Sequence, residues 1–191
     1  MNKIKELICK SPIINPTVVM VCICLVIALA LGVTNSITKP KIAKLEKQTQ
    51  DESMKEVLAA ESYEEKEQDG ETYYSAIDSG EVIGFVFITT EKGYGGDVKV
   101  MTATDTAGKV KAVKILDVTN ETPGLGQNTA KENFYSQFAG KSGSISVVKN
   151  GAKDNEVNAV TGATISSTAV TRAVNAALDL YAKSADGGAK K

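Results

Sequence analysis

The hydrophobic and polar positions divide the chain into regions of different character. An uncharged stretch extends from residue 13 to residue 36, and its apolar centre runs from Val18 to Val33. A helix rises about 1.5 Å per residue, so about 20 apolar residues cross the hydrocarbon layer of a membrane. We therefore predict a transmembrane helix at residues 13–36, after a short N-terminal segment at residues 1–12.

A cleaved signal peptide is the alternative interpretation of this stretch. Lysines precede the apolar run, and Ala28-Leu29-Ala30 resembles a cleavage site. The apolar run continues past this site to Val33, which favours an uncleaved anchor. The flanking lysines are Lys3, Lys5 and Lys10 on one side and Lys39, Lys41, Lys44 and Lys47 on the other. Because the two flanks are nearly balanced, the positive-inside rule does not fix the orientation.

Residues 37–70 are predicted to form a charged juxtamembrane helix and a connection. Pro40 fits the first turn of this helix. Its sparse apolar stripe consists of Ile42, Leu45, Met54 and Leu58. The acidic sequence ESYEEKEQDGE, residues 61–71, has little pattern, and we interpret it as a solvated connection or a frayed helix end.

A strand-rich region follows, in which β-branched and aromatic residues alternate with turn signals. The predicted strands are residues 72–78, 81–90, 96–105 and 109–119. In the last of them, Val110, Ala112, Leu116 and Val118 are expected to share one face, with Lys114 as the exception. This near-alternation is typical of a half-buried antiparallel strand.

Helical patterns come late in the sequence. Residues 128–140 predict a short helix, and residues 144–151 a further strand and turn. A final amphipathic helix is predicted at residues 167–183, and the tail at residues 184–191 is expected to be disordered. The apolar face of the final helix consists of Val170, Val174, Ala177, Leu178 and Tyr181. We therefore predict an α+β domain at residues 71–183, with a twisted, mainly antiparallel sheet packed by helices.

The composition excludes several classes of function. Histidine is absent, which removes the commonest general base and a common metal ligand. The cysteines, Cys9, Cys22 and Cys24, all precede the predicted domain. Lys and Arg number 22 against 23 Asp and Glu, so the chain lacks the basic field that nucleic acids require. We expect no metal site, no catalytic residue and no nucleic-acid partner.

Two glycine-bearing loops carry the candidate chemistry. In NETPGLGQ, residues 120–127, Gly124 and Gly126 permit a positive φ or a close approach of the backbone. The structural alternative for this loop is a tight connection between a strand and a helix. In AVTGATISST, residues 159–168, five hydroxyl side chains surround one glycine, and the segment runs directly into the predicted final helix. Both loops therefore have a structural explanation as well as a functional one.

Capping of the final helix by Ser166 or Ser167 explains only one of these hydroxyl groups. A helix N-terminus is also a natural site for a phosphate group. No Lys or acidic residue lies within two positions of Thr164, and the chain has no histidine. If Thr164 is esterified by a phosphate, a separate enzyme is therefore expected to form the bond.

The sequence resembles the covalent FMN-binding domain family at these two loops. The matching motifs are ETPGLG at residues 121–126 and TGAT at residues 161–164, in this order and followed by a helix. The sequence GYGGDVKVM at residues 93–101 looks more like the G subunit of Rnf electron-transport complexes than the C subunit of the sodium-pumping NADH:quinone reductase. The single span and the chain length agree, and the similarity covers residues 10–183.

The resemblance implies that FMN is attached through its phosphate, as a phosphodiester, to Thr164. The positions that match the flavin-lining and attachment loops are Glu121, Thr122, Gly124, Leu125, Gly126, Thr161, Gly162, Ala163 and Ile165. Lys149 is the expected polar partner of the flavin. Asn158 stands three residues before Thr161, where the family usually has aspartate, and it keeps the hydrogen-bonding shape without the charge.

The resemblance also implies a location and a role. A flavin transferase forms the bond outside the cytoplasm, so a single-pass protein of the cytoplasmic membrane is expected, with residues 1–12 cytoplasmic, the span in membrane lipid and the domain extracytoplasmic. In Rnf complexes, electrons pass between ferredoxin and NAD+ through several subunits, coupled to Na+ or H+ movement. This chain would be one relay among those subunits of an ion-translocating oxidoreductase, without a complete active site of its own. The alternatives are an FMN domain of a different membrane reductase and a cofactor-free membrane-anchored adaptor.

Overall fold

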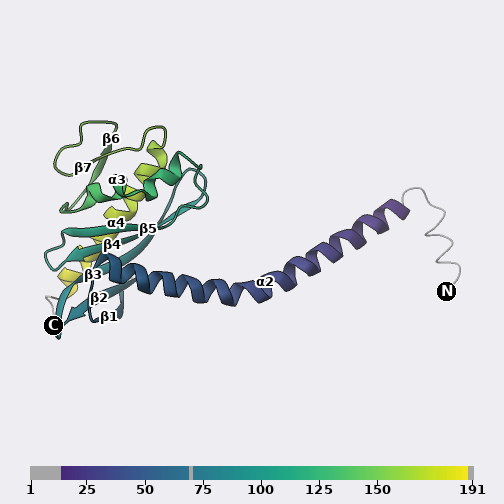
Figure 1. Cartoon of the computed structure of the whole chain (residues 1–191), viewed down its shortest axis with the longest axis horizontal. Coiled ribbons are helices and arrows are strands. Elements are labelled where there is room, and N and C mark those ends of the chain that lie inside the picture. The colour runs from purple at the N-terminus through teal and green to yellow at the C-terminus, as the bar shows by residue number, and fades with distance from the viewer. Residues whose placement is uncertain (1–13, 69–70, 189–191) are drawn as a thin grey trace. The chain divides into compact units, whose positions relative to one another are not determined.

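The structure, a computed structural model, describes residues 14–68 and 71–188 (Figure 1). The chain forms two units, residues 1–49 and 50–191. The expected N-terminal segment at residues 1–12, with its lysines and Cys9, lies outside the described residues, as do residues 189–191.

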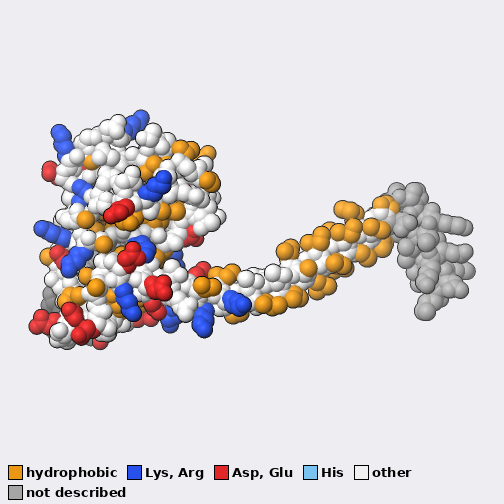
Figure 2. All heavy atoms as spheres, in the orientation of Figure 1, with side chains coloured by type: hydrophobic (Ala, Val, Ile, Leu, Met, Phe, Trp, Pro, Cys, Tyr) orange, Lys and Arg blue, Asp and Glu red, His pale blue; other side chains and the backbone are white. Residues whose placement is uncertain are grey.

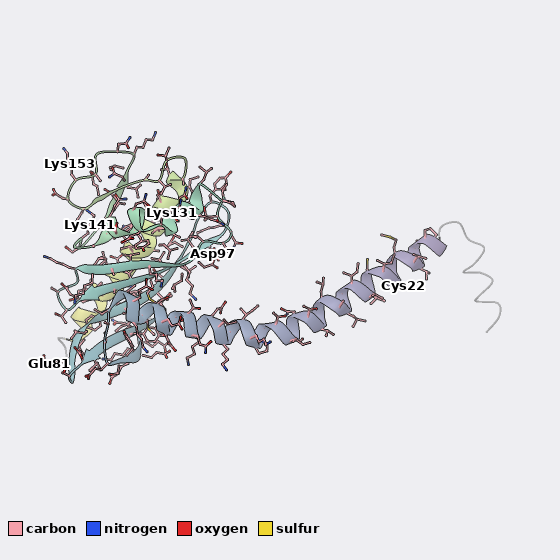
Figure 3. All side chains as sticks on the ribbon, viewed as in Figure 1. Cys22, Glu81, Asp97, Lys131, Lys141 and Lys153 are labelled. Atoms are coloured by element: carbon pink, nitrogen blue, oxygen red, sulfur yellow. The ribbon has the colours of Figure 1, made fainter. Side chains whose placement is uncertain are left out.

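The first helix in the described part of the chain, α2, runs from Ile14 to Val57 (Figure 1). Within the part of the chain that the structure describes, it is the one helix that is long and apolar enough to cross a membrane. Its large apolar side chains from Val18 to Leu45 are exposed (Figure 2), and so are the free cysteines Cys22 (Figure 3) and Cys24. This agrees with the predicted span.

Pro40 lies inside α2 and does not begin a second helix, which corrects the expectation that it occupies a first turn. A proline inside a helix removes one main-chain donor and its ring crowds the carbonyl one turn back, which costs about 3 kcal/mol, so the flanking residues must favour the helix. Lys, Leu, Glu and Gln dominate the following residues, and these are strong helix formers. The helix therefore continues through the proline.

The second unit is built on a five-stranded antiparallel sheet in which neighbouring strands are consecutive in the sequence (Figure 1). The strands are β1 (Ser62–Gln68), β2 (Glu71–Asp78), β3 (Glu81–Lys92), β4 (Asp97–Asp105) and β5 (Val110–Asp117). The antiparallel sheet confirms the predicted α+β class. Strand β1 occupies residues expected to form a connection or a frayed helix end. It is a charged edge strand in which only Tyr63 packs against the core, so it lacks an alternating pattern.

Helix α4, from Thr164 to Gly188, covers one face of the sheet by packing on β3 and β4. Val170, Ala173 and Val174 of this helix are fully buried. The hydroxyl of Thr89 in β3 donates to the carbonyl of Ala173 at 2.8 Å. The helix starts before the predicted residue 167 and extends to Gly188, into the tail expected to be disordered. The sheet therefore fixes the position of the first turn of α4.

The last turns of α2 cover the opposite face of the sheet. Met54, Val57 and Leu58 form a second hydrophobic core with residues that include Val86 and Met101. The second unit accordingly begins at residue 50, ahead of the strands.

Strand β5 contains a β-bulge, and the residues that were predicted to share one face of this strand lie on both faces. The register shifts by one residue between the pairs Ala112–Ala103 and Val110–Thr104. As a result, Val110 packs in the core beneath α4, whereas Ala112 packs in the core beneath α2. Lys114, the exception in the pattern, forms an ion pair with Glu56 of α2. The bulge thus distributes the apolar residues of β5 between both cores.

The connection between β5 and α4 is made of short elements. They are η1 (Gly126–Ala130), α3 (Glu132–Tyr135), η2 (Ser136–Phe138), β6 (Ser146–Val148) and β7 (Glu156–Asn158). The helix predicted at residues 128–140 is therefore broken into short pieces. The rings of Phe134 and Phe138 lie 5.7 Å apart and are buried in the core beneath α4. Strand β7, which pairs in parallel with β6, was not predicted.

Candidate functional site

The two glycine-bearing loops and the start of α4 enclose a pocket of about 570 Å³. Its lining residues are Tyr94, Thr122, Leu125, Gly126, Gly162, Ala163, Thr164, Ile165 and Ser166. A Cβ atom on Gly162 would lie only 3.1 Å from Cδ2 of Leu125, so the two loops approach each other closely. Loops that are about 40 positions apart in the sequence therefore form one site.

Large apolar side chains are exposed around this pocket. In the described part of the second unit, the exposed large hydrophobic residues are Val82, Tyr94, Leu125 and Ile165. Three of these four line the pocket, with Tyr94 71%, Leu125 43% and Ile165 53% exposed. Exposed apolar side chains that gather in one place mark a binding surface. The pocket therefore presents an apolar rim to a ligand.

A buried carboxylate, that of Glu121, joins the walls of the pocket. The residue is only 2% exposed. Its Oε1 accepts the main-chain N–H groups of Tyr94 (2.8 Å) and Gly95 (3.1 Å), and its Oε2 accepts the hydroxyl of Ser166 (2.5 Å). One side chain thus connects the loop at residues 93–96, its own loop and the first turn of α4.

Two glycines make room for this carboxylate. A Cβ atom on Gly126 would lie 2.4 Å from Oε2 of Glu121, and one on Gly93 would lie 2.2 Å from Oε1. Both distances are too short for any side chain. Gly124 has a different function, since its φ of +77° forms the turn and a Cβ there would meet open space. The two glycines of PGLG are therefore required for two different reasons.

The loop that carries Tyr94 is also fixed from its other side. Arg172 of α4 donates to the carbonyl of Lys92 at 2.9 Å and forms an ion pair with Glu91 at 3.4 Å. The N–H of Gly93 donates to the carbonyl of Gly96 at 2.8 Å. The main chain of Tyr94 is therefore held in place while its ring stays exposed.

Hydrogen bonds also fix the turn that leads from the end of β5 to Glu121. Oδ1 of Asp117 accepts the N–H of Thr119 at 2.8 Å, and this bond lowers the pKa of the Asp117 carboxyl. The N–H of Glu121 donates to the carbonyl of Val118 at 3.0 Å. The turn that ends β5 thus aims Glu121 inward.

The serines near the start of α4 do not cap it, which corrects the expectation for Ser166 and Ser167. Ser166 donates to Glu121, and the hydroxyl of Ser167 accepts the N–H of Val160 at 3.0 Å. Since α4 begins at Thr164, both serines lie inside the helix and bond to the loops in front of it. Their hydroxyls fasten the helix to the pocket walls.

The threonines of the same segment differ in whether their hydroxyls form hydrogen bonds. Thr168 donates to the carbonyl of Thr164 at 2.8 Å, as is common for a threonine inside a helix. Among the described residues, the hydroxyls of Thr161 and Thr164 form no hydrogen bond, and both residues are exposed. Of these two, Thr164 lines the pocket. It is therefore the free hydroxyl that faces the site.

The first turn of α4 also supplies main-chain donors. Thr164 is the first residue of the helix, and the N–H of Ser167 is the first to bond one turn back, to the carbonyl of Ala163 (2.9 Å). The N–H groups of Thr164, Ile165 and Ser166 therefore have no carbonyl within the helix. Such donors, together with the helix dipole, favour an anion.

Three of the residues expected at the site, Lys149, Asn158 and Thr161, do not line this pocket. Lys149 is exposed in the loop after β6 and does not line the pocket. Oδ1 of Asn158 accepts the N–H of Ala152 at 3.0 Å, and the main-chain N–H and carbonyl of Asn158 bond to the side-chain amide of Gln137. Asn158 and Thr161 instead line a neighbouring polar pocket of about 350 Å³. The structure gives Asn158 a role in holding the loop between β6 and β7.

Tyr94 and Ser166 line the pocket but were not predicted as site residues. The glycines on both sides of Tyr94, at positions 93, 95 and 96, are the signal for this loop, because they allow its backbone to approach the 120–121 segment closely. Nothing in the local sequence indicates that Ser166 bonds to a carboxylate from a distant loop.

Comparison with known proteins identifies related sequences. The FMN-binding domain family matches residues 93–179. The chain is 35% identical over 178 residues to the G subunit of the Na(+)-translocating ferredoxin:NAD(+) oxidoreductase complex of Acetobacterium woodii, covering 82% of this chain and 85% of that protein. It is 32% identical over 157 residues to the G subunit of the proton-translocating ferredoxin:NAD(+) oxidoreductase complex of Clostridium ljungdahlii, covering 82% and 84%.

Solved structures share the fold. The crystal structure of NqrC from Shewanella oneidensis matches with a TM-score of 0.52 at 21% identity, over 65% of this chain and 67% of that one. The C subunit of the Na(+)-translocating NADH-quinone reductase of Parabacteroides distasonis matches with a TM-score of 0.51 at 24% identity, over 59% and 61%. These matches agree with the predicted fold class.

The role of Gly126 can be separated from that of Gly124 by substitution. Gly126→Ala should displace the Glu121 carboxylate and reduce the free energy of unfolding by about 1–3 kcal/mol, because buried donors lose their acceptor. Hydrogen exchange at Tyr94 and Gly95 should then accelerate relative to strand β4. Gly124→Ala, which only strains the turn, should leave this exchange unchanged. Equal protection of the 93–96 peptide in the two variants would contradict the role assigned to Glu121.

Proposed function

Since the chain belongs to the family of G subunits of ion-translocating ferredoxin:NAD(+) oxidoreductase complexes, we propose that its electrons pass through an FMN bound covalently at Thr164. The family assignment confirms the resemblance recognised in the sequence. The chain is a membrane-anchored flavoprotein subunit that relays electrons, and other subunits of the complex are its partners.

The observation that carries the proposal is the position of the free Thr164 hydroxyl. It faces a pocket with an apolar rim and belongs to the first residue of a long helix. The pocket volume of about 570 Å³ lies within the common range for small-molecule sites, about 300–1,000 Å³. A cofactor with an anionic phosphate and a flat aromatic ring system matches both features.

Different residues of the pocket would contact the phosphate and the ring system of FMN. The N–H groups of Thr164, Ile165 and Ser166 would hold the phosphate, because they are the unbonded donors of the helix N-terminus. The side chains of Tyr94 and Leu125 would contact the ring system. When bound, FMN supplies a ring that takes up and releases electrons, while the protein provides position and electrostatics.

The phosphodiester requires a separate flavin transferase. The buried carboxylate beside the first turn of α4, that of Glu121, bonds to Ser166 and not to Thr164. Among the described residues, no side chain forms a hydrogen bond with the Thr164 hydroxyl that would let it act as the base. The chain would present this hydroxyl and its pocket, and the transferase would supply the base.

A cofactor-free adaptor explains these features less well. It could use the exposed side chains of Tyr94, Leu125 and Ile165 as a docking surface. It would leave the unbonded hydroxyl of Thr164 and the free N–H groups in the first turn of α4 unexplained.

Covalent attachment is tested by flavin fluorescence in a denaturing gel, after co-expression of the full chain with a flavin transferase. The wild-type band should fluoresce, and the Thr164→Ala band should be dark. Thr168→Ala is the matched control, because it removes a hydroxyl that is already bonded within α4, and its band should stay fluorescent. A fluorescent Thr164→Ala band, or a flavin mapped to Thr161 by mass spectrometry, would contradict attachment at Thr164.

We propose that the domain lies outside the cytoplasm, where the transferase acts, and that lipid surrounds the exposed apolar part of α2. The second unit has no native cysteine, so Lys149→Cys places a single exposed thiol on it. A membrane-impermeant maleimide should label this thiol in intact cells to the same extent as in lysed cells. Labelling that appears only after lysis would place the domain in the cytoplasm.

A further inference from the structure

We propose that Glu121, in addition to joining the walls of the pocket, acts as a fixed negative charge that lowers the midpoint potential of the flavin bound there. This inference rests on the proposed attachment of FMN at Thr164. It assigns Glu121 a positioning and electrostatic role that its hydrogen bonds alone do not require.

The carboxylate lies directly behind the pocket wall. Tyr94, Gly126 and Ser166 line the pocket, and each of them is adjacent to a Glu121 oxygen. Gly126 has no side chain to separate the carboxylate from the pocket, and a Cβ there would lie 2.4 Å from Oε2. The wall between the charge and the ligand is therefore thin.

Among the described residues, Glu121 has no partner in the ion pairs Lys66–Glu64, Lys114–Glu56 and Arg172–Glu91. The partners of Glu121 are two main-chain N–H groups and one hydroxyl, all of them neutral donors. At 2% exposure, water screens this carboxylate poorly, so its field extends into the pocket.

The sign of the effect follows from electrostatics. Reduction brings electrons to the ring system, and a nearby fixed negative charge makes their arrival less favourable. The hydroxyl dipole of Ser166 points its proton at the carboxylate and offsets part of this charge. Removal of the charge and removal of the hydroxyl should therefore shift the potential in opposite directions.

The experiment is a spectroelectrochemical titration of the full, flavin-loaded chain in detergent. Glu121→Gln, which keeps the size of the side chain and removes its charge, should favour the reduced form about tenfold. For a two-electron couple this is a positive shift of about 30 mV. Ser166→Ala, which keeps the carboxylate and removes a donor, should shift the potential in the negative direction. Gel fluorescence of each variant reports whether the flavin is attached.

The outcomes separate this inference from the proposed function. A dark wild-type band overturns the proposed function and this inference with it. A fluorescent band and an unchanged potential in Glu121→Gln overturn this inference alone. Shifts of the same sign in both variants also overturn it, because they would report a loosened pocket and not a charge. If Glu121→Gln does not fold, the test rests on Ser166→Ala. Any result other than a negative shift of the midpoint potential in Ser166→Ala then overturns this inference.

Discussion

The three hydrogen bonds accepted by the buried carboxylate of Glu121 are the interactions on which the site depends. A buried carboxylate is costly unless donors surround it. Here the donors come from the Tyr94 loop and from α4, so the cost is offset only when both segments lie against the Glu121 loop. Gly93 and Gly126 follow from the same constraint, because a side chain at either position would occupy the space of the carboxylate. The pocket is the surface that this arrangement leaves open.

The two hydrophobic cores hold the elements that Glu121 connects. Helix α4 is fixed on β3 and β4 by a buried face that includes Val170 and Val174, and its first turn projects beyond that face toward the loops. Thr164 therefore has a rigid support on one side and an open pocket on the other. A covalent bond suits such a site, since an exposed apolar rim contacts a flat ligand without enclosing it. The tether and the rim would thus complement each other.

Much of this organisation follows from local sequence patterns. The alternation of residues predicts strands β2 to β5, and the two glycine-bearing loops indicate where the pocket lies. Strand β1 could not be predicted, because as an edge strand it turns only Tyr63 to the core. The bulge in β5 depends on its pairing with β4. The continuation of α2 through Pro40 depends on the helix-forming residues that flank the proline. The bond between Ser166 and Glu121 joins residues 45 positions apart, and only the fold brings them together.

The central claim is that the flavin occupies the pocket between the two loops and the start of α4. The most direct measurement compares the amide chemical shifts of the detergent-solubilised chain before and after flavin loading. The largest changes should fall on the N–H groups of Thr164 and Ile165 and on Tyr94 and Leu125, which surround the pocket. Changes concentrated instead around the neighbouring polar pocket, at residues such as Asn133, would contradict this placement of the cofactor.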